Sequence, residues 1–414
     1  MATEVRCMKV IGNYLYTVIG DTCYMIDWDG VRTTLGTLET SSGAAWIEGD
    51  GTNLCVCDTV HGYSYVAATW AEIAFPDAFA PSSLTFMDGY FIVSKSLSHR
   101  FYISDLNDPT TWDPLMYDEA VGDPDDLVCV YAINRDLWLM GKHSIEIWNN
   151  TGATDFPFER YLGGFINIGC RAARSVASSA KSVFWLDHTQ RVRMGTGVQS
   201  EVISTMQIEY QISQVPEGAL VNPEWVYAVG FFYTMDGHEF YQLSIGDYTW
   251  CYDVSTGYWH TRASGTANNR HPAQCYAWYH SKHLVGHYTR GNIYEWDRDT
   301  YTNDGEMMNK IRSAQTVHND KKRVFHSQLV LDFEAGVGNS DCTDPEADLE
   351  YSDDDGHTWS SVRSVPIGAS GFYETRAIWR RLGNARGRVY KVTIADPVKT
   401  VLLAAHLEAE GGKA

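Results

Sequence analysis

Residues 128–141 read VCVYAINRDLWLMG, two apolar runs of strand length on either side of a short turn at Asn134. Aromatic and β-branched residues fit the pleated surface of a sheet, so this stretch predicts a β-hairpin. Successive copies of this hairpin are separated by 37 to 56 residues, so one unit is repeated seven times. The other six turns centre near Gly12, Gly51, Asp88, Ala180, Asp236 and Ser281.

The repeated hairpin and its spacing predict an all-β chain built around a β-propeller. A third apolar segment often follows the hairpin, as in IEIWNNTG from Ile145 and WCYDVSTGYW from Trp250. Three or four strands per unit of about 40–50 residues are typical of propeller blades, and closing them into a ring removes exposed sheet edges. We therefore expect six or seven blades over residues 1–305. No segment has a sustained helical period with caps, so we expect few helices.

The pattern changes after a polar stretch that runs from residue 303 to 323. In one of the strand-like segments that follow, Val389, Val392 and Ile394 alternate with Lys391 and Thr393. Such alternation is typical of a strand with one buried face. Residues 306–414 are therefore predicted to form a smaller C-terminal antiparallel β-domain. Two alternatives stay open: these strands add further blades, or the last strand closes the ring by pairing with the first blade.

Charge is distributed unevenly along the chain. The net charge is −20, from 32 Lys and Arg against 52 Asp and Glu, and residues 1–305 carry −18 of it. Between Tyr102 and Asn134 there are eight carboxylates and no Lys or Arg. A protein that grips DNA needs a basic surface, so the composition disfavours tight DNA binding. A solubilising acidic surface and a wall that repels passing DNA both fit this pattern.

The sequence gives no sign of a membrane span, a metal site or a cofactor. No run of 18 apolar residues occurs, and the N-terminal residues lack the apolar core of a secretion signal. The nine cysteines form no C-x-x-C, and an odd number without a secretion signal predicts reduced, buried thiols in a protein made in a cytoplasm. His280, His283 and His287 come closest to a metal-ligand spacing, but they span a hairpin turn. We interpret them as exposed turn residues.

Residues 352–359 read SDDDGHTW and match the Asp-box pattern S-x-D-x-G-x-T-W at Ser352, Asp354, Gly356, Thr358 and Trp359. In this turn the aspartate accepts hydrogen bonds from backbone N–H groups, the glycine supplies a left-handed conformation, and the tryptophan packs beneath. The motif is familiar from sialidases, where it lies away from the active site. We interpret it as a structural hairpin turn.

A sialidase or another glycosidase is the enzyme alternative. Glycoside hydrolysis requires two acids, or a Tyr–Glu pair, on facing strands, and a sialidase also requires three arginines around its substrate carboxylate. Arg376, Arg380 and Arg381 all lie in the predicted C-terminal domain, where a site centred on the propeller cannot use them. We therefore predict that the protein is not an enzyme. A carbohydrate-active or receptor-binding propeller is the alternative.

Residues 101–112, FYISDLNDPTTW, resemble the packaged DNA stabilisation proteins, a tail hub or nozzle family of short-tailed bacteriophages (podoviruses). Further matching segments follow in the same order, among them LWLMG from Leu137, DFPFER from Asp155, GHEFY from Gly237 and WRRLG from Trp379. The resemblance extends from about residue 80 to residue 400. It implies a structural protein of the phage tail, made in the host cytoplasm and present in the virion, with no catalytic residues.

The resemblance also implies a homohexameric ring below the portal and its adaptor, which closes the DNA exit channel and helps to retain and then release the genome. The implied partners are other copies of the chain, the portal adaptor, and a tail needle, tailspike or fibre. Genomic DNA passes without tight or sequence-specific binding. We expect an acidic channel wall, with arginines of the C-terminal domain contacting neighbouring subunits or the adaptor. These candidate contact residues are Arg376, Arg380, Arg381, Arg386 and Arg388.

Overall fold

A computed structural model of the chain describes residues 3–123, 125–215 and 228–412. The chain divides into two compact units. The first comprises Met1–Arg262 and Arg270–Trp296, and the second comprises Ala263–Asn269 and Asp297–Ala414. Each unit has its own sheets and its own hydrophobic core.

The first unit ends at Trp296, whereas the sequence placed the boundary after residue 305. The segment that follows Trp296 bonds to residues of the second unit. The side-chain amide of Asn303, for example, donates to the hydroxyl of Ser264 at 2.5 Å. The repeated hairpin does not reveal these contacts of residues 297–305, because the polar stretch that breaks the pattern begins only at residue 303, after the last blade strand has ended at Trp296.

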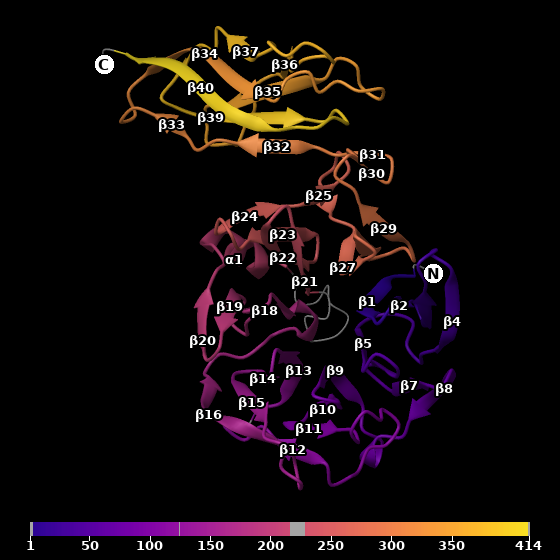
Figure 1. Cartoon of the computed structure of the whole chain (residues 1–414). Coiled ribbons are helices and arrows are strands. Elements are labelled where there is room, and N and C mark those ends of the chain that lie inside the picture. Colours follow the sequence, from indigo (N-terminus) through magenta and orange to yellow (C-terminus); the bar gives the residue numbers. More distant parts are fainter. Residues whose placement is uncertain (1–2, 124, 216–227, 413–414) are drawn as a thin grey trace. The chain divides into compact units, whose positions relative to one another are not determined.

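Seven antiparallel sheets succeed one another around a ring and form the blades of a propeller (Figure 1). Within the described residues, six blades have four strands each and the seventh has three. The predicted all-β propeller is confirmed.

Blades 1 to 3 consist of β1 (Val5–Ile11), β2 (Tyr14–Ile19), β3 (Thr22–Ile26) and β4 (Arg32–Thr37); β5 (Ala45–Gly49), β6 (Leu54–Asp58), β7 (Gly62–Val66) and β8 (Thr69–Ile73); and β9 (Pro81–Met87), β10 (Tyr90–Lys95), β11 (Arg100–Ile103) and β12 (Tyr117–Glu119). Blades 4 to 7 consist of β13 (Leu127–Ile133), β14 (Asp136–Gly141), β15 (Ile145–Asn150) and β16 (Phe158–Ile166); β17 (Ala177–Ser178), β18 (Val183–Leu186), β19 (Val192–Thr196) and β20 (Gln199–Val202); β21 (Val229–Met235), β22 (His238–Ile245), β23 (Tyr248–Asp253) and β24 (Tyr258–Thr261); and β27 (Ala273–Tyr279), β28 (Lys282–His287) and β29 (Ile293–Trp296).

Each of the seven predicted hairpins forms the first two strands of one blade. Asp88, Asn134 and Asp236 occupy their turns with φ of 50°, 56° and 56°. Asn and Asp tolerate this left-handed region better than other residues that have a Cβ atom. In blade 4 the strands pair up to the turn itself, with Ile133 opposite Asp136. The residues that marked the repeat therefore also set the strand register.

The core of the propeller lies between neighbouring blades. The second strands of blades 2 and 5, β6 and β18, are buried along their whole length, so both of their faces are covered. Trp138 of blade 4 and Trp185 of blade 5 are 1% and 0% exposed, and their ring centroids lie 6.0 Å apart in an edge-on arrangement. Removing a buried aromatic side chain of this size typically costs about 3–5 kcal/mol. Packing between blades therefore holds the ring together.

The ring closes where blade 7 meets blade 1, the two ends of the repeat (Figure 1). The side-chain amide of Gln274 donates to Glu4 at 2.7 Å, and the hydroxyl of Tyr279 donates to the backbone oxygen of Asn13 at 2.9 Å. Val5 and Ala277 are buried in one cluster at this seam. The alternative in which the last strand of the chain closes the ring is therefore wrong.

Helical elements are few within the described residues. The helix α1 (Met206–Ser213) follows blade 5, and the hydroxyl of Thr205 accepts a hydrogen bond from its backbone N–H at Ile208. Ile208 and Ile212 are buried in the core cluster of blades 5 and 6. Two short 3₁₀ turns, η1 (Pro76–Ala78) and η2 (Ala173–Ser175), precede blades 3 and 5.

The second unit contains two larger antiparallel sheets. One has the order β32-β39-β35-β36 with β33 also paired to β39, and in the other β34 pairs with β37, β38 and β40. The predicted antiparallel C-terminal domain is confirmed. Its larger strands are β32 (Lys310–Ser313), β33 (Val317–His318), β34 (Val324–Phe333), β35 (Glu346–Ser352), β36 (Arg363–Pro366), β37 (Ala377–Arg380), β38 (Asn384–Ala385), β39 (Gly387–Ile394) and β40 (Leu402–Gly411). Shorter strands are β25 (Ala263–Ser264), β26 (Asn269–Arg270), β30 (Thr302–Asn303) and β31 (Glu306–Met307).

The alternation in β39 differs from the sequence prediction at one position. The buried face of this strand carries Arg388, Tyr390, Val392 and Ile394, whereas Val389 lies on the other face. Side chains on a strand alternate with a period of two, so Val389 cannot share a face with Val392. The core therefore contains an arginine where the sequence analysis placed a valine.

Candidate functional site

The Asp-box turn follows β35 and is held by hydrogen bonds within the motif. Asp354 Oδ1 accepts from the backbone N–H of Thr358 at 2.8 Å, and Oδ2 accepts from the Thr358 hydroxyl at 2.6 Å. Ser352 Oγ donates to Asp354 Oδ1 at 2.7 Å and accepts from the N–H of Gly356 at 2.8 Å. The bonds from Thr358, followed by that from Ser352, lower the pKa of Asp354 well below its usual value. The motif therefore contributes local turn geometry.

Trp359 ends the motif in a more exposed position than a core tryptophan. It is half-buried, and the Lys391 ammonium lies 4.1 Å from its ring centroid. Such a cation–π contact at a partly exposed position contributes about 0.5–1 kcal/mol. Trp359 therefore covers one face of β39 and does not form the centre of the domain core.

Arg388 is buried inside the second unit, where it pairs with Asp353, so it is not one of the expected subunit contacts. Its side chain is 2% exposed and forms a forked pair with Asp353, with Nε–Oδ1 at 2.6 Å and Nη2–Oδ2 at 2.8 Å. The guanidinium carbon lies 4.0 Å from the ring centroid of Tyr351, and Nη1 donates to the backbone oxygen of Leu382. All three nitrogens are engaged, so Arg388 cannot also reach a partner.

The other four candidate arginines are exposed. Arg376 lies 3.6 Å from the Asp332 carboxylate, and Arg386 donates to the backbone oxygen of Lys321 at 3.1 Å. Exposed ion pairs of this kind contribute little to stability. Arg376, Arg380, Arg381 and Arg386 are therefore accessible for contacts outside the second unit.

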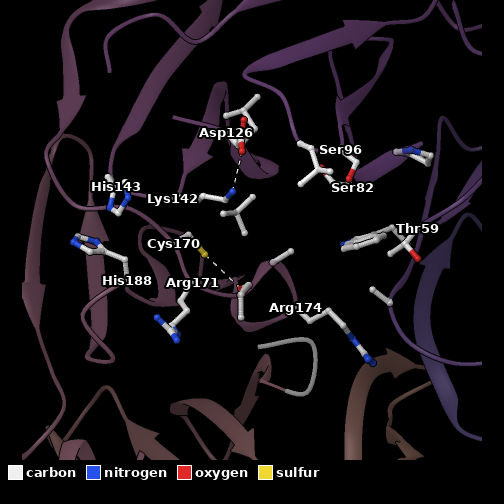
Figure 2. A pocket seen from close by; sticks show the side chains of 18 residues that line it. Thr59, Ser82, Ser96, Asp126, Lys142, His143, Cys170, Arg171, Arg174 and His188 are labelled. Carbon is white, nitrogen blue, oxygen red and sulfur yellow. Dashed lines mark hydrogen bonds and ion pairs between the residues drawn. The ribbon is translucent and has the colours of Figure 1, made fainter. Parts of the chain in front are cut away.

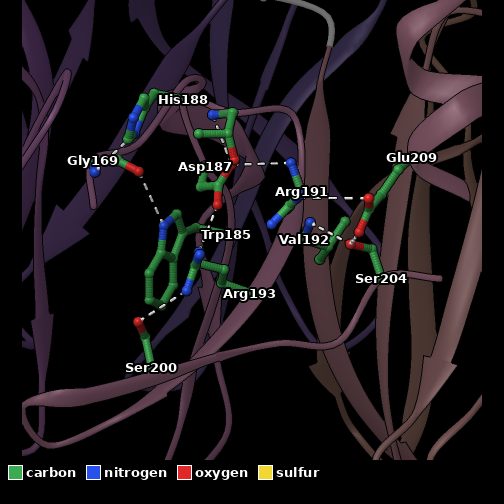
Figure 3. A network of polar contacts seen from close by, with 11 residues as sticks. Gly169, Trp185, Asp187, His188, Arg191, Val192, Arg193, Ser200, Ser204 and Glu209 are labelled. Carbon is green, nitrogen blue, oxygen red and sulfur yellow. Dashed lines mark hydrogen bonds and ion pairs between the residues drawn. The ribbon is translucent and has the colours of Figure 1, made fainter. Parts of the chain in front are cut away.

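A buried carboxylate in blade 5, which sequence reasoning missed, organises the turn between β18 and β19 (Figure 3). Asp187 is 0% exposed. Its Oδ1 accepts from the backbone N–H of Thr189 at 2.8 Å, the Thr189 hydroxyl at 2.6 Å and the N–H of Arg191 at 3.0 Å. Its Oδ2 accepts from Arg193 Nε at 2.5 Å. Asp followed two residues later by Thr after an apolar strand was the available signal, because Asp side chains favour such turns.

A pocket of about 360 Å³ opens at the inner side of blades 2 to 5, and we call it the central pocket (Figure 2). It is lined by the starts of β5, β9 and β13, by η2 with the residues before it, and by turns between second and third strands. Its lining includes the cationic side chains of Lys142, Arg171 and Arg174 and the imidazoles of His143 and His188. Asp126 is the only carboxylate among the described lining residues. The pocket is therefore basic, although the protein as a whole is acidic.

Three side chains of the central pocket have defined bonds. Lys142 Nζ lies 2.8 Å from Asp126 Oδ2 at its edge. Arg174 Nη2 donates to the backbone oxygen of Arg6 at 3.0 Å, while its buried Nη1 has no hydrogen-bond partner among the described residues. His188 Nδ1 accepts from the backbone N–H of Gly169 at 3.2 Å, which places the proton of a neutral ring on Nε2.

The acidic segment predicted between Tyr102 and Asn134 runs through β11 and β12 to β13. Several of its carboxylates have local partners. Asp108 accepts from the backbone N–H and the hydroxyl of Thr110, and Glu119 pairs with Arg100 at 2.7 Å. Part of the segment's charge is therefore used in its own turns and strand pairs.

The three histidines considered as metal ligands have separate surroundings. His280 packs against Trp28, with centroids 3.7 Å apart, whereas His283 Nδ1 lies 2.9 Å from the hydroxyl of Tyr276. His287 Nδ1 accepts from backbone N–H groups of its own turn. Within the part of the chain that the structure describes, no three His, Cys, Asp or Glu residues group to hold a metal ion. No described helix is long and apolar enough to cross a membrane.

Two family models match the chain in tandem. The model described as bacteriophage P22 Gp10, beta-propeller, matches residues 8–301, and the model described as bacteriophage P22 Gp10, beta-sandwich, matches residues 310–410. The two matches correspond to the two parts of the fold. A comparison with curated proteins found no match.

Two solved structures are similar to part of the chain, both with TM-scores below 0.5. BamB from Moraxella catarrhalis is 10% identical, with a TM-score of 0.45 over 71% of this chain and 83% of that one. The Pan2 WD40 domain from Neurospora crassa is 7% identical, with a TM-score of 0.46 over 71% of this chain and 89% of that one.

Proposed function

Because the chain belongs to the family of bacteriophage P22 Gp10 and is thus a structural protein of a phage particle, we propose that it is the hub or nozzle of a short phage tail. In this role it closes the DNA exit channel below the portal and adaptor, retains the packaged genome and releases it at ejection. The observation that carries the proposal is the tandem match, which covers both the propeller and the C-terminal sandwich. A match to the propeller alone would suit many functions, because propellers serve unrelated proteins.

The closed propeller is suited to a load-bearing wall. Seven blades share buried interfaces, including the seam between blade 7 and blade 1, so the ring has no unpaired end blade. Close-packed protein interiors resist compression. A protein that retains DNA under pressure requires such rigidity.

The charge distribution supports passage of DNA without capture. Residues 1–305 carry a net charge of −18. A basic conduit would bind phosphates and release counterions along the whole length of the genome, whereas an acidic wall gives only repulsion that salt screens within about 8–10 Å. We propose that the wall of the assembled channel is predominantly acidic.

We further propose a ring of six copies in contact with the portal adaptor and with a needle, tailspike or fibre. Arg376, Arg380, Arg381 and Arg386 are exposed on the second unit. Guanidinium groups form forked hydrogen bonds with carboxylates, so these arginines are suited to contacts with neighbouring subunits or the adaptor.

The decisive experiment removes the protein from the particle. A nonsense mutation in its gene, grown without a suppressor, should give heads that package DNA and then lose it, as measured by nuclease protection. Electron microscopy of wild-type tails should show a six-fold ring at the channel exit. Mutant particles that keep their genome, or a single copy per virion, would contradict the proposal.

The same purified protein should show no turnover of sialosides or capsular polysaccharide. Arg376, Arg380 and Arg381, the arginines considered for a sialidase site, belong to the second unit and not to the propeller. Hydrolysis that disappears when one carboxylate is replaced would support the carbohydrate-active alternative.

A further inference from the structure

The central pocket presents hydrogen-bond donors from several blades to one space (Figure 2). Lys142 and Arg174 contribute cationic donors, and the bond from Gly169 to Nδ1 of His188 leaves its Nε2–H as a further donor. The hydroxyls of Thr59 and Ser96 also belong to the lining. Such a set of donors has excess positive charge and matches an anion.

Arg174 has one guanidinium nitrogen, Nη1, whose hydrogen-bonding capacity is not used by the described residues. This nitrogen is buried and has no hydrogen-bond partner within the described residues. A buried donor without a partner costs about 1–3 kcal/mol, more when it is charged. Arg174 also borders a second cavity of about 210 Å³ that is lined by the inner strands. An anion in the central pocket can accept from this donor when the Arg174 side chain turns toward the pocket.

The apolar part of the lining restricts the class of anion. Trp46, Leu97, Leu127 and Val128 form much of the remaining wall. The volume of about 360 Å³ suits a few amino acid residues and is far too small for a DNA duplex. The surrounding protein is strongly acidic, which also disfavours nucleic acid. A carboxylate carried on an apolar peptide fits both halves of the pocket.

We propose that the central pocket is a peptide-binding site that takes a carboxylate, from an acidic side chain or a C-terminus, together with adjoining apolar side chains. Arg174 binds the carboxylate at the inner end, and Lys142 adds positive charge at the edge. The hydrophobic residues of the peptide pack on Trp46 and Leu127. This site is separate from the proposed role in closing the DNA channel and stands whether or not that role is correct.

The test measures fluorescence anisotropy of rhodamine-labelled peptides with the full chain. One probe has the sequence Gly-Ser-Gly-Leu-Val-Glu with a free C-terminus, and its match has Gln and a C-terminal amide. We expect the acidic peptide to bind at least about tenfold more tightly, because charge-assisted bonds to two cations are lost in the neutral one. Lys142→Ala and Arg174→Ala should each weaken binding of the acidic peptide by about three- to tenfold.

Lys282→Ala is the matched control. Lys282 forms an ion pair with Glu295 at 2.7 Å with an exposure similar to that of Lys142, but it lies in blade 7 outside the pocket. This variant should bind as the wild type does. Lys142 is 47% exposed, so its replacement tests the site even if Arg174→Ala fails to fold. Equal binding of both peptides, no binding up to about 5 mM, an equal loss in Lys282→Ala, or displacement by a single-stranded DNA 12-mer would overturn the proposal.

Discussion

Replacing Asp187 tests how a single buried carboxylate supports blade 5 (Figure 3). Asp187→Ala removes the acceptor of three bonds in the β18–β19 turn and the partner of Arg193, whose side chain is only 13% exposed. Breaking a buried ion pair by deleting one partner costs about 3–5 kcal/mol, because the other charge stays buried. Asp187→Asn retains an acceptor for the turn and loses the charge opposite Arg193, so we expect about 1.5–3 kcal/mol.

The measurement is urea unfolding at pH 7, followed by tryptophan fluorescence, since Trp185 pairs with Arg193 across the same two strands. Arg191→Ala is the control: its side chain is 51% exposed and lies 3.6 Å from Glu209, so we expect a loss of at most about 1 kcal/mol. In the double variant Asp187→Asn with Arg193→Leu, the cost should fall below the sum of the single variants by about 1–3 kcal/mol. Asp187→Ala unfolding within about 1 kcal/mol of wild type would refute the reasoning.

Three further predictions concern other parts of the chain. Trp359→Ala should lower the free energy of unfolding by about 1–2 kcal/mol, because the Trp359 ring is half-buried. Trp379 is 1% exposed, so Trp379→Ala should lower it by about 3–5 kcal/mol. Thermal melts that rank the two variants in the opposite order would contradict this. Burial, together with neighbouring positive charges, lowers the pKa of His271 in the folded protein to about 3, whereas in the unfolded chain it is about 6.5. Between these values the unfolded chain binds a proton that the folded protein does not, so the protein loses stability as the pH drops from about 6.5 towards 4. The urea midpoint should fall over this range, and it should fall less in His271→Gln. Cys55 and Cys57 are 0% exposed and burial raises the pKa of both thiols, so iodoacetamide should label them in urea and leave them unmodified in the native protein, as peptide mass spectrometry can show.

The sequence allowed the propeller to be predicted because each hairpin carries its own local signal. Asp88, Asn134 and Asp236 adopt the positive φ that their turns require, and the seven hairpins, 37 to 56 residues apart, indicate six or seven blades. The burial of Arg388 could also be predicted from the sequence. Val392 and Ile394 define the buried face of β39, and period-two alternation places residue 388 on the same face. The assumption that charged residues lie outside obscured this.

The central pocket could not be predicted, because its residues are distant in the sequence. Trp46, Lys142 and Arg174 line one pocket only when four blades are placed around one axis. No local pattern indicates which turn of each blade faces inward. Where the first unit ends also depends on contacts distant in sequence, since the partner of Asn303 is Ser264, which precedes the last blade.

The seam between blade 7 and blade 1 determines when the propeller can finish folding during synthesis. Glu4 and Gln274, which bond across it, are separated by 270 residues. At a translation rate of about 5–20 residues per second, the first strand leaves the ribosome about 15 to 50 seconds before its partner exists. During that interval β1 has a neighbour on one side only, and its apolar residues Val5 and Met8 lack the cover that blade 7 supplies. The nascent chain therefore exposes the apolar residues of β1 during most of its synthesis, and ring closure is the last step in folding of the propeller.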